Sequence, residues 1–240
     1  MILAALPLIF ADNSPLSGYT VKRVRKEKGK HMEEKQTAVK TFSLLVATIG
    51  IYLFLWQVIS ARADLPVYYY GRLIELLGIG LFIALALHTP MRFSEMGIVT
   101  SRQTLLRSLA LGGAVALFVF CALAAISKIL YGFPSFSWYV RGDISRVTYF
   151  LVAPLQEVLA KSVMYYSFEL CFGKDHPVPI VLMSAAVFGI FHVVYGIRMM
   201  LLAMALTVLT GWMFRRVRCV WGCALAHFAL GFLPACFGFA

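Results

Sequence analysis

The 240-residue chain is 61% hydrophobic and only 14% charged, with a mean hydropathy of +0.82. An ordinary soluble domain is closer to half apolar and a quarter charged, so this composition excludes a water-soluble globular protein. The formal net charge of +11 does not indicate nucleic-acid binding, because the basic residues cluster between Lys22 and Lys40 and then recur in short connections between apolar runs. That distribution is typical of basic residues that orient helices in a bilayer, so we expect a lipid bilayer and no nucleic acid as partner.

Residues 1–40 are predicted to form an N-terminal arm. The first ten residues are an apolar stub that is too short to span a membrane and lacks the basic flank and cleavage site of a secretory signal. Residues 20–40 are polar and strongly basic, which favours a cytoplasmic arm lying against anionic lipid headgroups. A charge run that is simply solvated is an equal alternative. Residues 41–240 are predicted to form a single transmembrane domain.

Seven apolar segments follow the arm, and each is close to the ~20 residues that a helix needs to cross a bilayer. We therefore predict an all-α fold, a polytopic transmembrane bundle of about seven spanning helices. The sixth segment is short, so a tilted, re-entrant or merged helix is an alternative there. The segments are 41–60, 67–88, 105–131, 147–172, 178–195, 199–214 and 220–239.

The connections predict an orientation. If the basic arm is cytoplasmic, alternation of seven crossings places most of the remaining arginines and lysines on the same side, as the positive-inside rule requires. We therefore expect a cytoplasmic N-terminus and an external C-terminus. The short loops and this charge bias favour a bacterial inner (plasma) membrane, and an organellar membrane is the alternative.

Four ionisable residues lie within the later segments. Glu157 is in the middle of the fourth, Lys161 follows one turn later, His192 is near the end of the fifth and His227 is in the middle of the seventh. Such residues cost ~2.5 to 3.5 kcal/mol on insertion scales and usually face the protein interior for a functional reason. A lone membrane histidine is more often a packing residue, but a carboxylate with two imidazoles is typical of sites that activate water or bind metal.

Other ionisable residues have simpler explanations. Arg72 and Glu75 are three apart, which favours an ion pair within one helix. Glu169 and Lys128 lie near helix ends, where we expect them to reach the headgroups.

Two cysteines and a histidine follow one another at four-residue steps in the last segment. Cys219, Cys223 and His227 have residue types that zinc prefers. The outer two lie ~12 Å apart along a helix, so only an adjacent pair could share one ion. Packing of small side chains is therefore the favoured interpretation.

Three stretches resemble the signature regions of one family. They read VAPLQEVLAKSVMYYSFE, VLMSAAVFGIFHVVYG and GWMFRRVRCVWGCALAHFALGF. They look like the Glu-Glu-x-x-x-Arg, Phe-x-x-x-His and His-x-x-x-Asn motifs of the CPBP intramembrane proteases, which include the CAAX prenyl endopeptidases and Abi-type bacteriocin-processing proteins. Phe188 and His192 match the second motif, and His227 matches the start of the third. The resemblance covers a core at residues 147–240.

The chain departs from the family at three motif positions. Gln156 replaces the first glutamate, Lys161 the arginine and Gly231 the asparagine. In the family, the first glutamate and the second-motif histidine activate water, and the last histidine and asparagine stabilise the oxyanion. An amide cannot take a proton from water, so Gln156 is not the base. Loss of one oxyanion donor costs ~10² to 10³ in rate unless water, Ser162 or a backbone amide replaces it.

The leading hypothesis is an intramembrane endopeptidase that cleaves a membrane-associated protein or peptide, without a cofactor or bound metal. Glu157 faces the site if its helix is rotated or kinked near Pro154. The expected catalytic roles are water activation, orientation of the water or carbonyl, and oxyanion stabilisation, with two supporting residues. The catalytic set is Glu157, His192, His227 and Gln156, and the supporting set is Lys161 and Phe188.

Three alternatives remain. A catalytically inactive relative would bind or chaperone a membrane peptide. A zinc protease would use Glu157, His192 and His227 as ligands. A small-molecule transporter ranks lower.

Overall fold

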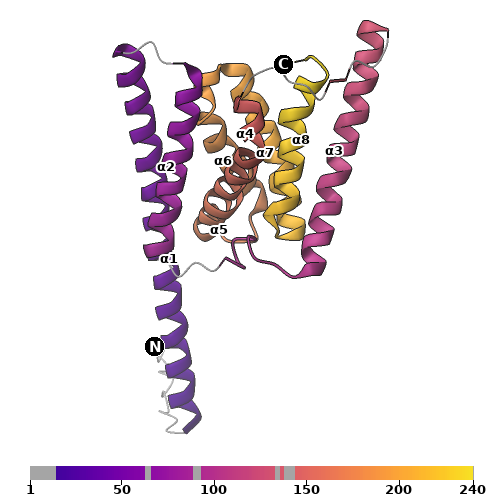
Figure 1. The fold of residues 1–240 in the computed structure, drawn as a ribbon. Helices are drawn as coiled ribbons and strands as arrows, with labels where there is room; N and C mark the ends of the chain where they lie inside the picture. Colours follow the sequence, from indigo (N-terminus) through magenta and orange to yellow (C-terminus); the bar gives the residue numbers. More distant parts are fainter. Residues whose placement is uncertain (1–14, 63–65, 89–92, 133–135, 138–143, 240) are drawn as a thin grey trace, which may run out of the picture.

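The computed structural model describes residues 15–62, 66–88, 93–132, 136–137 and 144–239, and within them it is all-helical with no strand. The prediction of an all-α transmembrane bundle is confirmed (Figure 1). The elements are α1 (Pro15–Arg62), α2 (Val67–His88), α3 (Arg102–Tyr131), α4 (Ile144–Glu157), the π-helix η1 (Val158–Tyr165), α5 (Tyr166–Phe172), α6 (Pro177–Ile190), the 3₁₀ turn η2 (Val193–Tyr195), α7 (Ile197–Val217) and α8 (Val220–Cys236).

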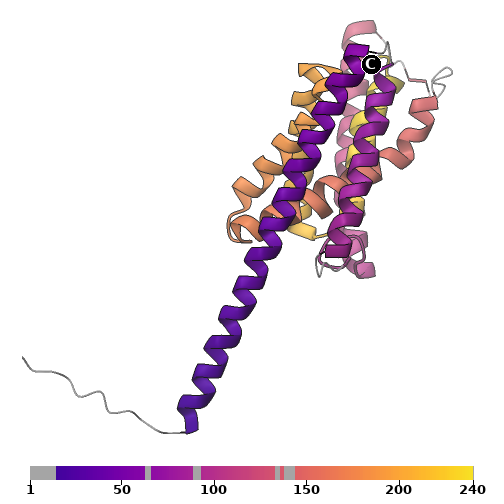
Figure 2. The same ribbon diagram turned by 90° about the vertical axis from the view of Figure 1, so that its left-hand side faces the viewer.

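Helix α1 is far longer than the predicted segment at 41–60. The basic stretch is itself helical, and the helix runs without a break across residue 40. Its first half projects beyond the bundle along the same axis (Figures 1 and 2). The arm therefore continues the first span and does not turn to follow the end of the bundle. The apolar stub at residues 1–10 lies outside the described residues.

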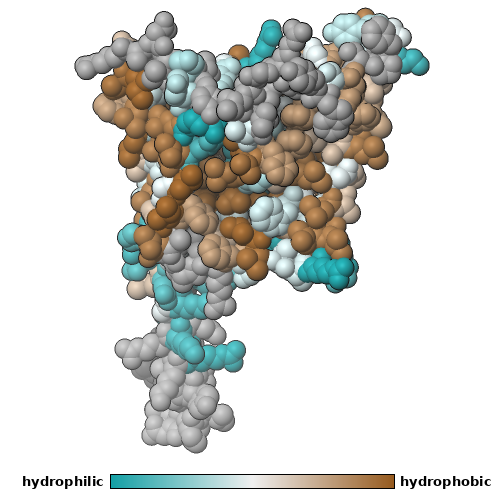
Figure 3. All heavy atoms as spheres, in the orientation of Figure 1, coloured by the Kyte–Doolittle hydropathy of each residue, from teal (hydrophilic) through white to brown (hydrophobic). Residues whose placement is uncertain are grey.

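Within the described residues, three helices are long and apolar enough to cross a membrane: the Lys28–Ala61 part of α1, α3 and α7. Helices α6 and α8 are apolar but shorter. The sixth segment, predicted to be short, is the 21-residue α7. Hydrophobic side chains cover most of the visible face of the bundle (Figure 3). The chain is therefore an integral membrane protein, and the start of α1 and the end of α8 lie at opposite ends of it (Figure 1).

Helices α3 and α8 pack closely because small residues face each other. A Cβ added at Gly112 would overlap the carbonyl oxygen of Gly222. The Ser108 hydroxyl also donates to the Cys219 carbonyl at 3.1 Å and accepts from the Gly222 amide at 3.0 Å. Small residues allow this approach in membranes, where close packing replaces the hydrophobic effect as the driving force.

A partly buried ion pair ties α5 to the turn between α7 and α8. Arg218 donates from Nη1 to Glu169 Oε1 at 2.6 Å and from Nη2 to Glu169 Oε2. Glu169 is buried, so the prediction that it reaches the headgroups is wrong. The predicted ion pair within α2 is confirmed, with Arg72 Nη1 at 2.7 Å from Glu75 Oε2.

Candidate active site

The fourth apolar segment is not a uniform α-helix. Pro154 has no amide N–H and so removes one α-helical hydrogen bond. Four residues later the backbone becomes π-helical from Val158 to Tyr165. A π-helix uses i→i+5 hydrogen bonds and therefore changes which side chains share a face. The sequence places the irregularity at Pro154 itself, whereas the structure places it one turn later. Glu157 and Lys161 are both fully buried there.

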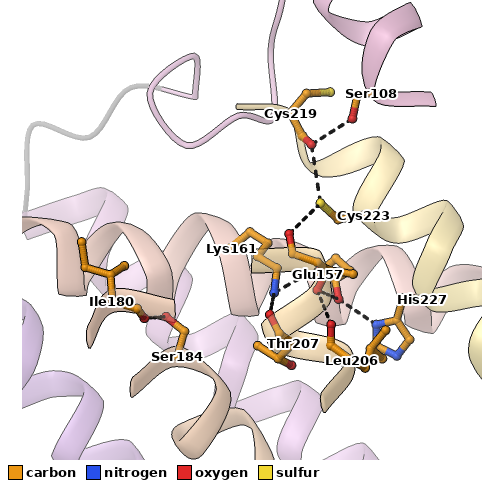
Figure 4. Close-up of polar contacts among 11 residues, drawn as sticks. Ser108, Glu157, Lys161, Ile180, Ser184, Leu206, Thr207, Cys219, Cys223 and His227 are labelled. Atoms are coloured by element: carbon orange, nitrogen blue, oxygen red, sulfur yellow. Dashed lines mark hydrogen bonds and ion pairs between the residues drawn. The ribbon is translucent and has the colours of Figure 1, made fainter. Parts of the chain in front are cut away.

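The Glu157 carboxylate lies at the centre of a buried polar cluster (Figure 4). Its Oε1 is 2.9 Å from His227 Nδ1, and its Oε2 is 3.6 Å from Lys161 Nζ. Lys161 also donates to the Thr207 carbonyl at 3.3 Å, and the Thr210 hydroxyl lies 3.5 Å from Oε1. Buried charges are tolerated when they are paired and hydrogen-bonded. The carboxylate therefore joins α4, η1 and α8 and fixes the orientation of the His227 ring.

His192 lies on a turn beyond the end of α6. Its Nδ1 is 2.8 Å from the Phe188 carbonyl, which accepts the Nδ1 proton and leaves Nε2 as the acceptor nitrogen. The Phe188 ring centroid is 4.6 Å from that of His192 and 6.1 Å from that of His227. Tyr52 of α1 supports the turn by donating to the Phe191 carbonyl at 3.4 Å. The two imidazoles thus pack against the same phenyl ring.

His192 lines a cavity of about 250 Å³ between α2, the α4–η1 segment and α6. The polar side chains that line it are Glu75, Gln156 and His192. The remaining walls are apolar, formed by Gly78, Ile79, Phe82, Leu155, Val158, Leu159, Val163, Phe188 and Phe191. Glu157 and His227 do not line this cavity.

The predicted catalytic residues therefore form two layers. Gln156 and His192 face the cavity, whereas Glu157 and His227 contact each other behind it. Phe188 belongs to both layers, because it lines the cavity and packs on both imidazoles. Direct activation of a cavity water by Glu157, as expected from the sequence, is not the arrangement that this geometry favours.

The structure explains why a glycine occupies position 231. A Cβ added there would overlap the Tyr149 hydroxyl, so Tyr149 occupies the space that a side chain would need. The Tyr149 ring also packs edge-on against His227, with centroids 6.1 Å apart. Ser162 is committed elsewhere, since its hydroxyl donates to the Met96 carbonyl at 2.7 Å. Of the two hydroxyls, only that of Tyr149 lies beside α8.

The cysteines of α8 are structural. Cys223 Sγ donates to the Thr210 carbonyl at 3.3 Å, and Cys219 is buried at the start of the helix. Across the described part of the chain, no three His, Cys, Asp or Glu side chains are grouped so that they could hold a metal ion.

Sequence reasoning missed three contributors. Tyr149 and Thr210 carry no pattern that distinguishes them from other residues of an apolar helix. Glu75 did carry a signal, because a carboxylate within an apolar segment is costly, but its spacing to Arg72 explained it as an ion pair. The structure shows that Glu75 also faces the cavity.

A family model described as Type II CAAX prenyl endopeptidase Rce1-like matches residues 144–233, from the start of α4 to near the end of α8. No curated protein and no solved structure matches the chain significantly. The matched region contains all six residues predicted to build the site. Residues 144–233 of this integral membrane protein are therefore similar to the CPBP family, the protease family that includes the CAAX prenyl endopeptidases.

Proposed function

We propose that this protein is an intramembrane endopeptidase that hydrolyses a peptide bond of a membrane-associated protein or peptide. The match to a protease family supports the reaction class. The observation that carries the proposal is the position of His192, whose Nδ1 is hydrogen-bonded and whose ring lines an apolar cavity within the bundle. Apolar walls suit a substrate that arrives from the lipid phase, and an internal cavity is where an unwound substrate backbone is tolerated.

The proposed roles follow from the two layers. His192 Nε2 accepts a proton from water as the water oxygen bonds to the scissile carbonyl carbon. The Gln156 amide orients the water or the carbonyl. His227 is held by Glu157, whose charge Lys161 balances, and it supports the cavity wall through its contact with Phe188. Breakage of the C–N bond then returns the proton to the leaving amine. Glu157 acts through His227, because its own carboxylate is fully buried.

The test uses the full chain reconstituted in vesicles with a membrane-tethered peptide reporter. His192→Ala should reduce cleavage at least ~10²-fold, because general-base catalysis contributes ~10² to 10⁴. The matched control is His176→Ala at the exposed start of α6, which should cleave like the parent. A strong chelator should leave the parental rate unchanged, since no zinc takes part in the proposed reaction. Parental cleavage by His192→Ala would refute the assignment.

A peptide-binding function without hydrolysis is the second candidate. It is favoured by the neutral Gln156 side chain on the cavity. In the same vesicles, a non-hydrolytic binder would hold the reporter, so that an added reagent crosslinks the two, and no new peptide termini would form. An endopeptidase produces both termini in equal amounts.

We also propose that the basic part of α1 is cytoplasmic and that the protein resides in a bacterial inner membrane. The first half of α1 carries the basic cluster and projects from one end of the bundle (Figure 2). A cysteine that replaces the exposed Lys30 should react with a membrane-impermeant thiol reagent only after the membrane is permeabilised and the reagent reaches the cytoplasm. Labelling of this cysteine in intact cells would show that the N-terminal part of α1 is external and would contradict the proposed orientation.

A further inference from the structure

The cavity brings together one imidazole, one amide and one carboxylate. His192 and Gln156 come from the family-matched core, whereas Glu75 comes from α2, which lies outside the match. Among the described residues that line the cavity, Glu75 carries the only carboxylate. The amide of Gln156 has no capacity to take a proton. A carboxylate beside an imidazole is an effective pair for activating water.

We infer that Glu75 is a further catalytic residue, which shares with His192 the deprotonation of the attacking water. This inference rests on the proposed endopeptidase function. The pair of Glu75 and His192 accepts one proton from the water as the oxygen–carbon bond forms, and the pair gives that proton to the leaving amine as the C–N bond breaks. One acid and one amine product result, and no other reactant is consumed.

The packing of α2 explains why Glu75 faces the cavity. Gly71, Glu75 and Gly78 are spaced i, i+4 and i+7 and therefore share one face of the helix. A Cβ at Gly78 would overlap the Leu159 side chain of η1, and one at Gly71 would overlap the Tyr195 hydroxyl. Both glycines therefore bring α2 close to the walls of the cavity. Glu75 lies between these two contacts along the helix and lines the cavity.

Tyr195 links the Glu75 side of the cavity to His192. Its ring centroid is 6.0 Å from that of His192, and its hydroxyl lies against Gly71 of α2, one helical turn before Glu75. Tyr195 therefore contacts both His192 and the helix that carries Glu75. In the space-filling view, hydrophilic side chains interrupt the apolar surface near the upper part of α2 (Figure 3).

The ion pair with Arg72 does not account for this placement. Arg72 Nη1 contacts Oε2 of Glu75 at 2.7 Å, and Arg72 is not among the residues that line the cavity. If the ion pair served only to neutralise two charges so that α2 can insert into the membrane, it could lie on any face of α2. Here the basic partner is more exposed, while the carboxylate is buried against the cavity. Arg72 thus offsets the cost of a charge that the cavity needs.

The experiment compares five variants of the full chain in the vesicle assay, and one of them, Arg72→Gln, removes the partner of Glu75 in the ion pair. Glu75→Gln should lower kcat at least ~10²-fold and change KM by less than about threefold, because a base acts on the chemical step. Adding Gln156→Glu to Glu75→Gln returns a carboxylate to the same cavity and should restore at least about tenfold of the lost kcat. Glu95→Gln, which removes an exposed carboxylate, should cleave like the parent. His192→Ala reports on the proposed function independently.

The outcomes separate the two claims. Parental kcat in Glu75→Gln with an inactive His192→Ala overturns the role of Glu75 and leaves the endopeptidase in place. Parental cleavage in both variants removes the endopeptidase as well. A third outcome also overturns the inference. Glu75→Gln loses kcat, Gln156→Glu does not restore it, and Arg72→Gln loses as much activity and as much melting temperature as Glu75→Gln does. That result would show that the ion pair is structural.

Discussion

The two layers of the site differ in what surrounds their polar groups. Glu75, Gln156 and His192 border a cavity, whereas Glu157 and His227 are buried in protein, where Glu157 pairs with His227 and with Lys161. A group that borders a cavity can exchange protons with a substrate or water, while an enclosed charge network holds a geometry. The comparison therefore assigns chemistry to the first layer and positioning to the second.

Of the substitutions that test this distinction between the two layers, we expect the largest effect on stability at Glu157. Glu157→Gln leaves the fully buried Lys161 ammonium without a counter-charge, and loss of one partner of a buried pair costs about 3 to 5 kcal/mol. We expect a large drop in melting temperature and loss of cleavage. The double variant Glu157→Gln/Lys161→Met should recover the melting temperature but not the activity, because His227 still lacks its carboxylate. Unchanged melting of Glu157→Gln would contradict an enclosed network.

His192→Ala provides the opposite signature. It removes one hydrogen bond, worth about 1 kcal/mol, from a residue at the edge of a cavity. Thermal melting in detergent should therefore change little although cleavage is lost. If His192→Ala unfolded the protein as strongly as Glu157→Gln, the distinction between the layers would fail.

We expect a smaller effect on stability at Gly231, which lies on α8 one turn after His227. Gly231→Asn would restore the residue found at this family position, but its side chain would overlap the Tyr149 hydroxyl. Overpacking of this kind costs about 1 to 3 kcal/mol. Melting should therefore fall moderately, and adding Tyr149→Ala should recover it. Wild-type melting of Gly231→Asn alone would show that Tyr149 does not fill this space.

Much of the fold followed from hydropathy. The boundaries of α2, residues 67–88, agree with the predicted segment because polar residues and Pro66 interrupt the apolar run there. The long continuation of α1 was missed, since its charged residues resemble a solvated arm as much as a helix. The pair of Glu169 and Arg218 was also missed, because it joins residues 49 apart in sequence and no local spacing signals it.

The site was predicted only in part for a related reason. Ionisable residues in apolar helices and their motif spacing identified Glu157, His192 and His227. Which of them faces a cavity depends on how separate helices pack together, and the π-helix at Val158–Tyr165, which changes the side chains that share a face of the fourth segment, carries no sequence signal of its own. The place of Glu75 on the same cavity depends on α2, which the motifs do not cover.

The central claim, that water is activated by groups bordering the cavity, is tested most directly by cleavage of the tethered reporter in heavy-oxygen water. The parent chain should place one heavy oxygen atom in the new C-terminal carboxylate, detected by mass spectrometry, and His192→Ala should yield no such product. Absence of labelled product from the active parent, or equal labelling by His192→Ala, would contradict the account.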